Sequence, residues 1–356
     1  MSLPGSTGAV WTTRSSRGMP TAPAMAATVK KAGVGTRPRS ILRRVSTEMP
    51  AAAAMSTMLR SPRAVRRRAP RCSPRRRSAS LKGGRTMGSM VARDRNTGIV
   101  IGMIELKTPR EFAAMRVAGR VVAEALTRAR AAAAVGVTPV ELDEVAREVL
   151  AEHNAGSSFL GYRPGFAPTP YPAVLCVSVN DAIVHGIPDN TPLRDGDLVS
   201  IDFGAHINGW HGDSAQSFIV GTADPADVDL IAATERALAA GIEAAVIGNR
   251  LGDIGHAIGT VARAGGYGVP PDFGGHGIGR AMHESPSVMN EGTPGRGLRL
   301  RAGMAIAIEP MLHIGGDDYR TDPDGWTLRT VDGTRAAHAE HTIAITEDGP
   351  QILTAP

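Results

Sequence analysis

The stretch from Val199 to Val220 reads VSIDFGAHINGWHGDSAQSFIV, and the interpretation of the whole chain starts from it. Asn208-Gly209 separates two runs rich in β-branched and aromatic residues. An Asn-Gly pair suits a two-residue type I′ turn, because both loop positions of that turn need a positive φ angle. The stretch is therefore predicted to form a β-hairpin in which residue 207 lies opposite 210 and residue 202 lies opposite 215.

Two carboxylates fall on the same face of this predicted hairpin. Asp213 lies two residues before 215, so its side chain is a diagonal neighbour of Asp202. Aspartate is a poor strand former, and two like charges on one face repel each other. Either both acids are solvated on the surface, or they share a cation. The apolar residues beside them, such as Phe203 and Trp210, indicate a packed hairpin and favour the cation.

The charge of the chain is divided between two parts. The 356 residues have a net charge of +6, but residues 1–102 carry 21 Lys and Arg with only two acids, Glu48 and Asp94. The remaining residues carry 19 Lys and Arg against 32 Asp and Glu, a net charge of −13. An acidic domain at residues 103–356 is therefore expected behind a basic extension.

The basic extension, residues 1–102, shows no sustained apolar period and contains one aromatic residue, Trp11. Such a segment buries too little apolar surface to offset its chain entropy, so it is predicted to be disordered. Its arginine runs suit phosphate contacts with ribosomal or other nucleic acid, although base-stacking aromatics are missing. It also has the composition of an organelle transit peptide. Alternatively, it lies outside the mature protein, and translation begins at Met87, Met90 or Met103.

Cysteine content and hydropathy bear on the compartment. Cys72 and Cys176 are the two cysteines, and they form neither a disulfide framework nor a CxxC pattern, which favours a reducing compartment. No apolar run is long enough to span a bilayer, and the N-terminus lacks the apolar core of a secretory signal. A cytoplasmic protein without a membrane partner is expected.

Helix and strand signals from Met103 onward alternate in blocks. Capping boxes begin at Thr108 and Thr138, each with proline at the first helical position, and Asp224-Pro225 begins a third helix that should end near Val246. The order of helices, strands, helices and strands predicts an α+β fold of two similar halves around an antiparallel sheet. The other expected elements are a helix near Leu251–Ala264 and strands within Ala173–Val184, Met304–Glu309 and Glu340–Thr346.

Four further polar residues stand at unusual places. Glu309 ends one apolar strand and Glu340 opens another; an acid there lies at the solvent rim of a strand or binds a ligand. His276 lies in Gly274-Gly275-His276-Gly277-Ile278-Gly279, where glycines let the backbone approach a bound group closely, and His283 follows. Each residue alone is weak evidence, because a single histidine in such a loop usually has no ligand.

Taken together, these residues and the hairpin acids suggest a metal centre. Four carboxylates would repel each other, whereas two divalent cations would neutralise them. Ligation by many oxygens and one histidine, without a thiolate, favours Mn, Fe(II) or Co over a structural zinc. Two metals about 3.5–4 Å apart, bridged by carboxylates, are typical of hydrolases. The candidate ligands are Asp202, Asp213, His276, Glu309 and Glu340.

The motifs together resemble the type I methionine aminopeptidase family. The match runs from about Met103 to the C-terminus, with every motif in order. The resemblance implies the pita-bread (creatinase/aminopeptidase-like) fold, in which two pseudo-symmetric halves surround a curved antiparallel sheet. Only 30 residues separate Glu309 from Glu340, which leaves no room for the helical insertion of type II members. The motifs are Asn180-Asp-Ala-Ile-Val-His-Gly-Ile-Pro188, the Asp202/Asp213 hairpin, Gly275-His-Gly-Ile-Gly279, His283-Glu-Ser-Pro286, Ile308-Glu-Pro-Met311 and Glu340-His-Thr342.

The resemblance also implies a role for each candidate ligand. Asp202 would chelate the first of two divalent ions (Co, Mn, Fe(II) or Zn), and Asp213 and Glu340 would bridge the pair. His276 and Glu309 would hold the second ion. The implied activity is hydrolytic removal of the initiator methionine from nascent chains whose second residue is small.

Catalytic and substrate-binding residues follow from the same resemblance. His185 would donate a hydrogen bond near the scissile peptide, His283 would contact the substrate carbonyl, and Glu309 would accept a proton and later give it to the leaving amine. The methionine pocket resembles the family less closely, and ordinary core packing is the alternative for its aromatic residues. Its expected residues are Tyr162, Tyr171, Cys176 and Trp326, with Phe159 and Met282 where compact bacterial members often have Cys and Phe.

Two rival functions remain on this fold. A prolidase or aminopeptidase P shares the five ligands and would act on X-Pro peptides. A metal-free binding protein, associated with nucleic acid through the basic extension, would have lost ligands, and none is lost here. The expected partners are nascent polypeptide N-termini, with transient ribosome association, no membrane, no sequence-specific nucleic acid and a monomeric state.

Overall fold

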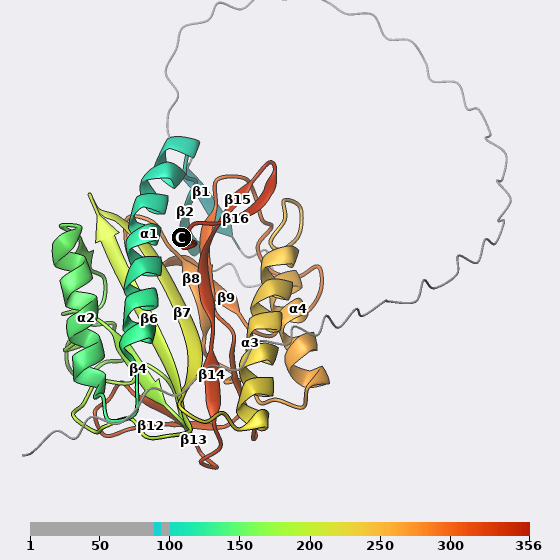
Figure 1. The fold of residues 1–356 in the computed structure, drawn as a ribbon. Coiled ribbons are helices and arrows are strands. Elements are labelled where there is room, and N and C mark those ends of the chain that lie inside the picture. The colour runs from blue at the N-terminus through green and yellow to red at the C-terminus, as the bar shows by residue number, and fades with distance from the viewer. Residues whose placement is uncertain (1–88, 94–99) are drawn as a thin grey trace, which may run out of the picture. The chain divides into compact units, whose positions relative to one another are not determined.

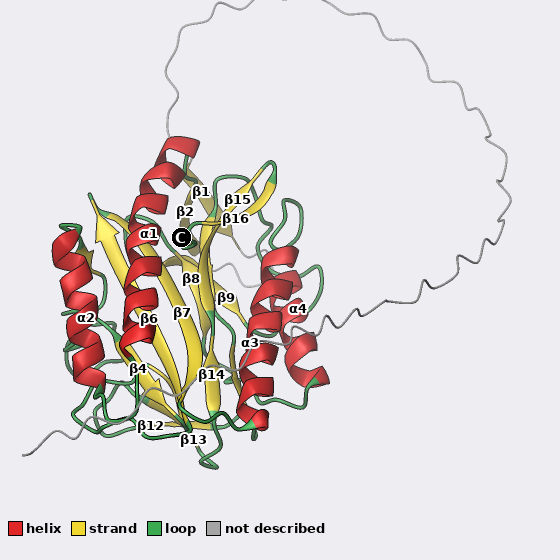
Figure 2. Cartoon of the chain, in the orientation of Figure 1, coloured by secondary structure: helices red, strands yellow, loops and turns green. Residues whose placement is uncertain are grey.

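The computed structural model of the chain describes residues 89–93 and 100–356, with side chains from Ile104 onward. Four helices and sixteen strands lie in this part (Figures 1 and 2). The helices are α1 (Pro109–Ala132), α2 (Pro139–Glu152), α3 (Pro225–Ala244) and α4 (Leu251–Ala264). The strands are β1 (Ser89–Arg93), β2 (Val100–Glu105), β3 (Gly156–Ser157), β4 (Cys176–Val179), β5 (Ala182–Val184), β6 (Asp197–Ile207), β7 (Trp210–Val220), β8 (Gly274–Gly277), β9 (Glu284–Met289), β10 (Ala305–Ile308), β11 (Met311–His313), β12 (Tyr319–Thr321), β13 (Leu328–Thr330), β14 (Ala336–His338), β15 (Glu340–Thr346) and β16 (Gly349–Ile352).

A nine-stranded sheet forms the centre of the fold. Its strands follow the order β3-β6-β7-β15-β10-β8-β9, while β4 pairs with β6 and β16 pairs with β15. All of these pairings are antiparallel. Strands far apart in the sequence therefore become neighbours, and β15 near the C-terminus lies between the hairpin strand β7 and β10.

The predicted hairpin is confirmed in its register. Strands β6 and β7 pair Ile207 with Trp210 and Asp202 with Ala215. The two loop residues, Asn208 and Gly209, have φ angles of 52° and 72°, as the type I′ turn requires. The turn therefore sets the register that places both aspartates on one face.

The helix starts are confirmed as well. Thr108 and Thr138 both form complete capping boxes, with Glu111 and Glu141 as their partners, and Asp224 caps α3. Helix α3 ends at Ala244, two residues before the expected end, and the strand expected at Met304–Glu309 is shorter at both ends. Glu309 therefore lies just beyond β10 rather than within it.

Two helix pairs cover one face of the sheet, α1 with α2 and α3 with α4 (Figures 1 and 2). Beneath α1 and α2, Ile201 and Phe203 of β6 pack into one apolar cluster. Beneath α3 and α4, Ile343 and Ile345 of β15 pack into another. Since side chains alternate across a strand, Asp202 lies on the opposite face of β6 from Ile201 and Phe203, where it lines a cavity.

Most of the predicted basic extension, residues 1–88 and 94–99 with Cys72, lies outside the described part, while residues 89–93 and 100–102 belong to β1 and β2. The boundary expected after residue 102 stays a prediction, and the antiparallel pair of β1 and β2 crosses it. Among the residues that the structure describes, no helix has the combination of length and hydrophobicity that a membrane span requires.

Candidate metal centre and substrate cavity

A cavity of about 230 Å³ brings together every site residue predicted from the sequence. Its lining combines the acids and His276 with aromatic and thioether side chains. The predicted residues that line it are Phe159, Tyr162, Tyr171, Cys176, His185, Asp202, Asp213, His276, Met282, His283, Glu309, Trp326 and Glu340.

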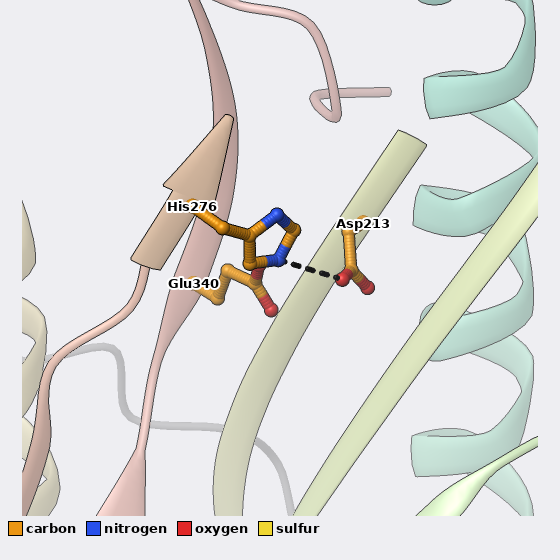
Figure 3. Close-up of side chains that lie close together, drawn as sticks. All are labelled: Asp213, His276 and Glu340. Carbon is orange, nitrogen blue, oxygen red and sulfur yellow. Dashed lines mark ion pairs between the residues drawn. The ribbon is translucent and has the colours of Figure 1, made fainter. Parts of the chain in front are cut away.

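Three of the predicted ligands converge from three strands. Asp213 of β7, His276 of β8 and Glu340 of β15 each offer one ligand atom, and these atoms all lie within 4.8 Å of one another (Figure 3). His276 Nε2 is 3.8 Å from Asp213 Oδ2 and 3.7 Å from Glu309 Oε1. A single cation at the centre of this group could therefore reach ligands that are up to 127 residues apart in the sequence.

The carboxylates lack the hydrogen bonds that buried acids need. Asp202 Oδ1, Asp213 Oδ1 and Glu340 Oε1 are buried and have no hydrogen-bond partner among the described residues. Burial and the neighbouring acids raise the pKa of Asp202 and of Glu340 well above the usual range. Orphaned carboxylate oxygens crowded in this way suit divalent cations, which would satisfy the lone pairs and neutralise the charge.

The backbone orients His276 toward the acids. Its Nδ1–H donates a hydrogen bond of 2.8 Å to the carbonyl of Gly277, which leaves Nε2 as the free ring nitrogen facing the acids, the usual arrangement of a metal-binding histidine. Gly275 lets β8 lie against β10, because a Cβ at that position would overlap the carbonyl oxygen of Ala307. The glycines around His276 thus have a packing role.

Glu309 occupies a second position within the acid cluster. Its backbone carbonyl accepts a hydrogen bond of 3.0 Å from Asn290 Nδ2. Burial raises the pKa of its carboxyl to about 7, although His276 opposes the shift. A carboxyl with a pKa near neutrality can exchange a proton at physiological pH.

Two further histidines flank the cavity in their neutral form. Burial lowers the pKa of His185 to about 4, and burial together with the neighbouring histidines lowers that of His283 to about 3. The ring of His283 stacks on Tyr162 at 5.1 Å and lies 4.1 Å from the ring of His276. His185 has a positive φ of 61°, and its Nδ1 is buried without a hydrogen-bond partner among the described residues; a non-glycine residue in this backbone conformation is uncommon.

The apolar walls are fixed by hydrogen bonds as well as by packing. Tyr171 donates its hydroxyl to the carbonyl of Gly186 at 2.8 Å, and Trp326 donates Nε1–H to the carbonyl of Thr169 at 3.0 Å. Their rings meet edge to face, 5.0 Å apart. The aromatic residues therefore pack as core residues and also line the cavity.

Sequence reasoning missed several residues around this site. His338 places Nε2 3.7 Å from Glu309 Oε2; it ends β14 whereas Glu340 opens β15, so strand alternation could not have identified it. Phe166 belongs to the loop between Tyr162 and Tyr171, where no sequence motif marks it. The other missed lining residues are Pro164, Val184, Phe273, Gly274 and Met311.

Comparison with known proteins agrees with this geometry. Residues 113–347 match the model of metallopeptidase family M24. Methionine aminopeptidase 1 of Mycobacterium tuberculosis is 52% identical over 251 residues, which cover 68% of this chain and 92% of that protein. A crystal structure of methionine aminopeptidase from Thermotoga maritima has 42% identity and a TM-score of 0.68, and the match covers 71% of this chain and 100% of that one.

A more distant structure shows the same fold with a different name. The prolidase from Pyrococcus furiosus has 22% identity and a TM-score of 0.55, and the match covers 70% of this chain and 65% of that one. At that identity the likeness concerns the fold alone, and it confirms the predicted pita-bread architecture. The family match and the high identity to the bacterial relatives show that the chain belongs to metallopeptidase family M24 and, within it, to the type I methionine aminopeptidases.

Proposed function

We propose that the protein is a metal-dependent aminopeptidase that removes methionine from the N-terminus of peptides whose second residue is small. This proposal rests on one observation: a buried acid cluster and apolar aromatic side chains line the same cavity. The acids suit a free α-amino group, and the pocket suits an unbranched apolar side chain whose sulfur contacts aromatic rings.

We infer that the acid cluster holds two divalent ions, with Mn, Fe(II), Co and Zn as candidates. Asp202 would bind the first ion, His276 and Glu309 the second, and Asp213 and Glu340 would bridge them. The orphaned oxygens of Asp202, Asp213 and Glu340 support this assignment. When bound, such ions would polarise the scissile carbonyl and provide a water nucleophile at neutral pH.

The roles proposed for the protein's own residues follow from their surroundings. Glu309, with its pKa raised to about 7, would accept a proton from the attacking water and return it to the leaving amine. His185 and His283 are neutral at pH 7, because burial depresses the pKa of each. Each can therefore donate a hydrogen bond to the substrate peptide without adding positive charge beside the amine.

The methionine side chain would lie against Phe159, Tyr171, Cys176, Met282 and Trp326, with Tyr162 beside His283. Cys176 is buried, and burial raises the pKa of its thiol well above the usual range, so it acts as a small apolar wall residue. The walls contain no charged side chain apart from the cluster and its histidines, which supports an apolar first residue.

We propose that residues 103–356 form the catalytic unit and that it acts as a monomer in the cytoplasm. Its substrates would be nascent polypeptides, with transient contact to the ribosome. All predicted site residues lie between Phe159 and Glu340, which supports a catalytic unit that does not depend on residues 1–102. Removal of residues 1–102 should leave turnover of short peptides unchanged; a collapse of activity in a folded protein would contradict this.

The experiment that tests the function is release of free methionine from Met-Ala-Ser and Met-Leu-Ser by metal-stripped protein, with Mn, Co, Fe(II) or Zn added back. We expect cleavage of Met-Ala-Ser only, and only after a metal is added. Cleavage of an X-Pro dipeptide in place of Met-Ala-Ser would favour the prolidase alternative. No cleavage by a folded protein with any metal would favour a non-catalytic binding protein.

A further inference from the structure

A fully buried histidine lies behind the acid cluster. His338 ends β14, where it pairs with the cavity residue Met311, and only 1% of its surface is exposed. Its Nε2 has no hydrogen-bond partner among the described residues. The residue is not among the five ligands or the histidines assigned to the substrate.

The atom nearest to this unpartnered nitrogen belongs to Glu309. His338 Nε2 lies 3.7 Å from Glu309 Oε2, while the other carboxylate oxygen, Oε1, lies 3.7 Å from His276 Nε2. The two oxygens of Glu309 thus face two different histidines. Among residues 104–356, no side chain donates a hydrogen bond to this carboxylate; Asn290 holds only the backbone carbonyl.

A small movement would turn this contact into a hydrogen bond. A distance of 3.7 Å is too long for one, but active-site hydrogen bonds are often long before ligands bind and tighten afterwards. A neutral imidazole carries one N–H, and a neighbouring carboxylate selects the tautomer with the proton on Nε2. A buried donor without an acceptor is unfavourable, so closing the gap is favourable.

We propose that His338 is a positioning residue that donates from Nε2 to Glu309 Oε2 and thereby directs Oε1 toward His276 and the metal site. Holding one oxygen leaves the other free for the cation and fixes the plane of the carboxylate. Residues that orient metal ligands in this way typically change metal affinity or activity about 10–100-fold when replaced. The inference rests on the proposed role of Glu309 as ligand and proton acceptor.

Three variants separate this role from mere packing. His338→Leu fills a similar volume without a donor, and His338→Gln restores an N–H at about the reach of Nε2. The matched control is His313→Leu: His313 is also fully buried with unpartnered ring nitrogens and lies on β11, the partner strand of β14, but it does not line the cavity.

The measurements are Mn²⁺ affinity by calorimetry and kcat and KM for Met-Ala-Ser, with thermal midpoints to confirm folding. We expect His338→Leu to lose roughly 10–100-fold in Mn²⁺ affinity or kcat with little change in KM, and His338→Gln to recover most of that loss. His313→Leu should lower the thermal midpoint without changing Mn²⁺ affinity.

The inference is overturned if His338→Leu matches the unsubstituted protein in both Mn²⁺ affinity and kcat. It is also overturned if His338→Gln and His338→Leu lose equally, because packing and not the donor would then matter. A protein that binds Mn²⁺ but releases no methionine would defeat the proposed function alone, since Mn²⁺ affinity would still report on His338.

Discussion

The two halves of the sheet build their shares of the acid cluster in different ways. The hairpin of β6 and β7 supplies Asp202 and Asp213 from inside two strands of 11 residues each. The other half supplies His276, Glu309 and Glu340 from short strands of 4, 4 and 7 residues, at or beside their ends. Strand register therefore fixes the first two residues, whereas packing between separate segments fixes the other three.

This difference predicts where the site is robust and where it is fragile. In the hairpin half, the ladder from Asp197 to Val220 is unbroken, so no single contact sets the positions of the acids. In the other half, β8 meets β10 through one pairing, Ile306 with Gly277, and Asn290 secures the backbone of Glu309. A local change should therefore move the second group more than the first.

The largest loss of activity should follow substitution of the residue at which the two halves of the sheet meet. Asp213 lies in the hairpin, and its carboxylate lies within 4.8 Å of ligand atoms of His276 and Glu340. Asp213→Asn removes the charge that would be shared between two cations, so we expect kcat/KM for Met-Ala-Ser to fall on the order of 10³-fold. Folding should be retained, because asparagine preserves the shape of the side chain.

The matched control for this variant is Asp229→Asn, an exposed aspartate on α3, which should keep full activity. Steady-state kinetics with saturating Mn²⁺ and calorimetry of Mn²⁺ binding give the two readouts. An Asp213→Asn protein with full peptidase activity would contradict the two-metal arrangement and would show that the cluster depends on one half only.

Alanine in place of one glycine in each half tests the fragility directly. A Cβ on Gly275 would overlap the carbonyl oxygen of Ala307, which is backbone of the neighbouring strand. A Cβ on Gly204 would meet Phe159 Cε1 at 2.7 Å and Ser158 Cβ at 3.0 Å, which are side-chain atoms rather than backbone. We expect Gly275→Ala to cost about 3 kcal/mol of unfolding free energy and Gly204→Ala about 1 kcal/mol.

Urea unfolding of both metal-stripped variants gives these free energies, with the unsubstituted protein as reference. Because the clash at Gly275 moves the strand that carries His276, this variant should also bind Mn²⁺ more weakly. The two variants could instead lose equal unfolding free energy, or Gly204→Ala could lose more. Either result would contradict the idea that strand register fixes the hairpin half and that packing between segments fixes the other half.

The same distinction explains what could be predicted from the sequence. Asn208-Gly209 and strand alternation were enough to place Asp202 opposite Ala215, and the capping boxes located the starts of α1 and α2. Glu309, Glu340 and His276 were recognised as candidates from the motifs they lie in. Their mutual distances depend on long-range pairing of β15 with β7 and β10, which no local pattern contains.

His338 and Phe166 are residues near the site that the sequence alone could not identify. His338 is a ring with no motif around it, and its significance follows only from its distance to Glu309. Phe166 lies in a loop whose path depends on Arg163, which donates to the carbonyl of Pro168 at 2.8 Å. Such contacts within an irregular segment have no period to detect, so only the structure could place Phe166 at the cavity.

The pH dependence of stability isolates the contribution of Glu309. Its carboxyl has a pKa raised from 4.5 to about 7 in the folded protein, so the folded state binds this proton more tightly than the unfolded state does. The stabilisation is fully present below the unfolded pKa of 4.5, falls as the pH rises from 4.5 to about 7, and is gone above pH 7. The metal-stripped protein should therefore lose about 2 kcal/mol relative to Glu309→Gln between pH 5.5 and pH 8.

Comparing the two proteins cancels the titration of His185 and His283, which both retain and whose pKa values do not depend on Glu309. Unfolding free energies from urea titrations at pH 5.5 and pH 8 give the difference. Saturating Mn²⁺ should abolish the loss at pH 8 in the unsubstituted protein, because the cation replaces the proton. If the difference in unfolding free energy between the two proteins stays constant with pH, the carboxyl of Glu309 is solvated rather than buried.

The smallest change in activity should follow substitution of an exposed residue of the cavity lining that belongs to neither half of the sheet. Phe166 is 63% exposed, lines the cavity and meets Trp326 edge to face at 5.8 Å. Phe166→Ala removes an apolar contact that substrate makes equally in its ground and transition states. We therefore expect KM for Met-Ala-Ser to rise roughly threefold with kcat unchanged.

Leu160→Ala is the matched control, since Leu160 is 49% exposed but lies outside the cavity lining, and it should change neither constant. A fall in kcat for Phe166→Ala would mean that the loop helps to position the reacting groups, and the chemistry would then depend on an irregular segment as well as on the two halves of the sheet.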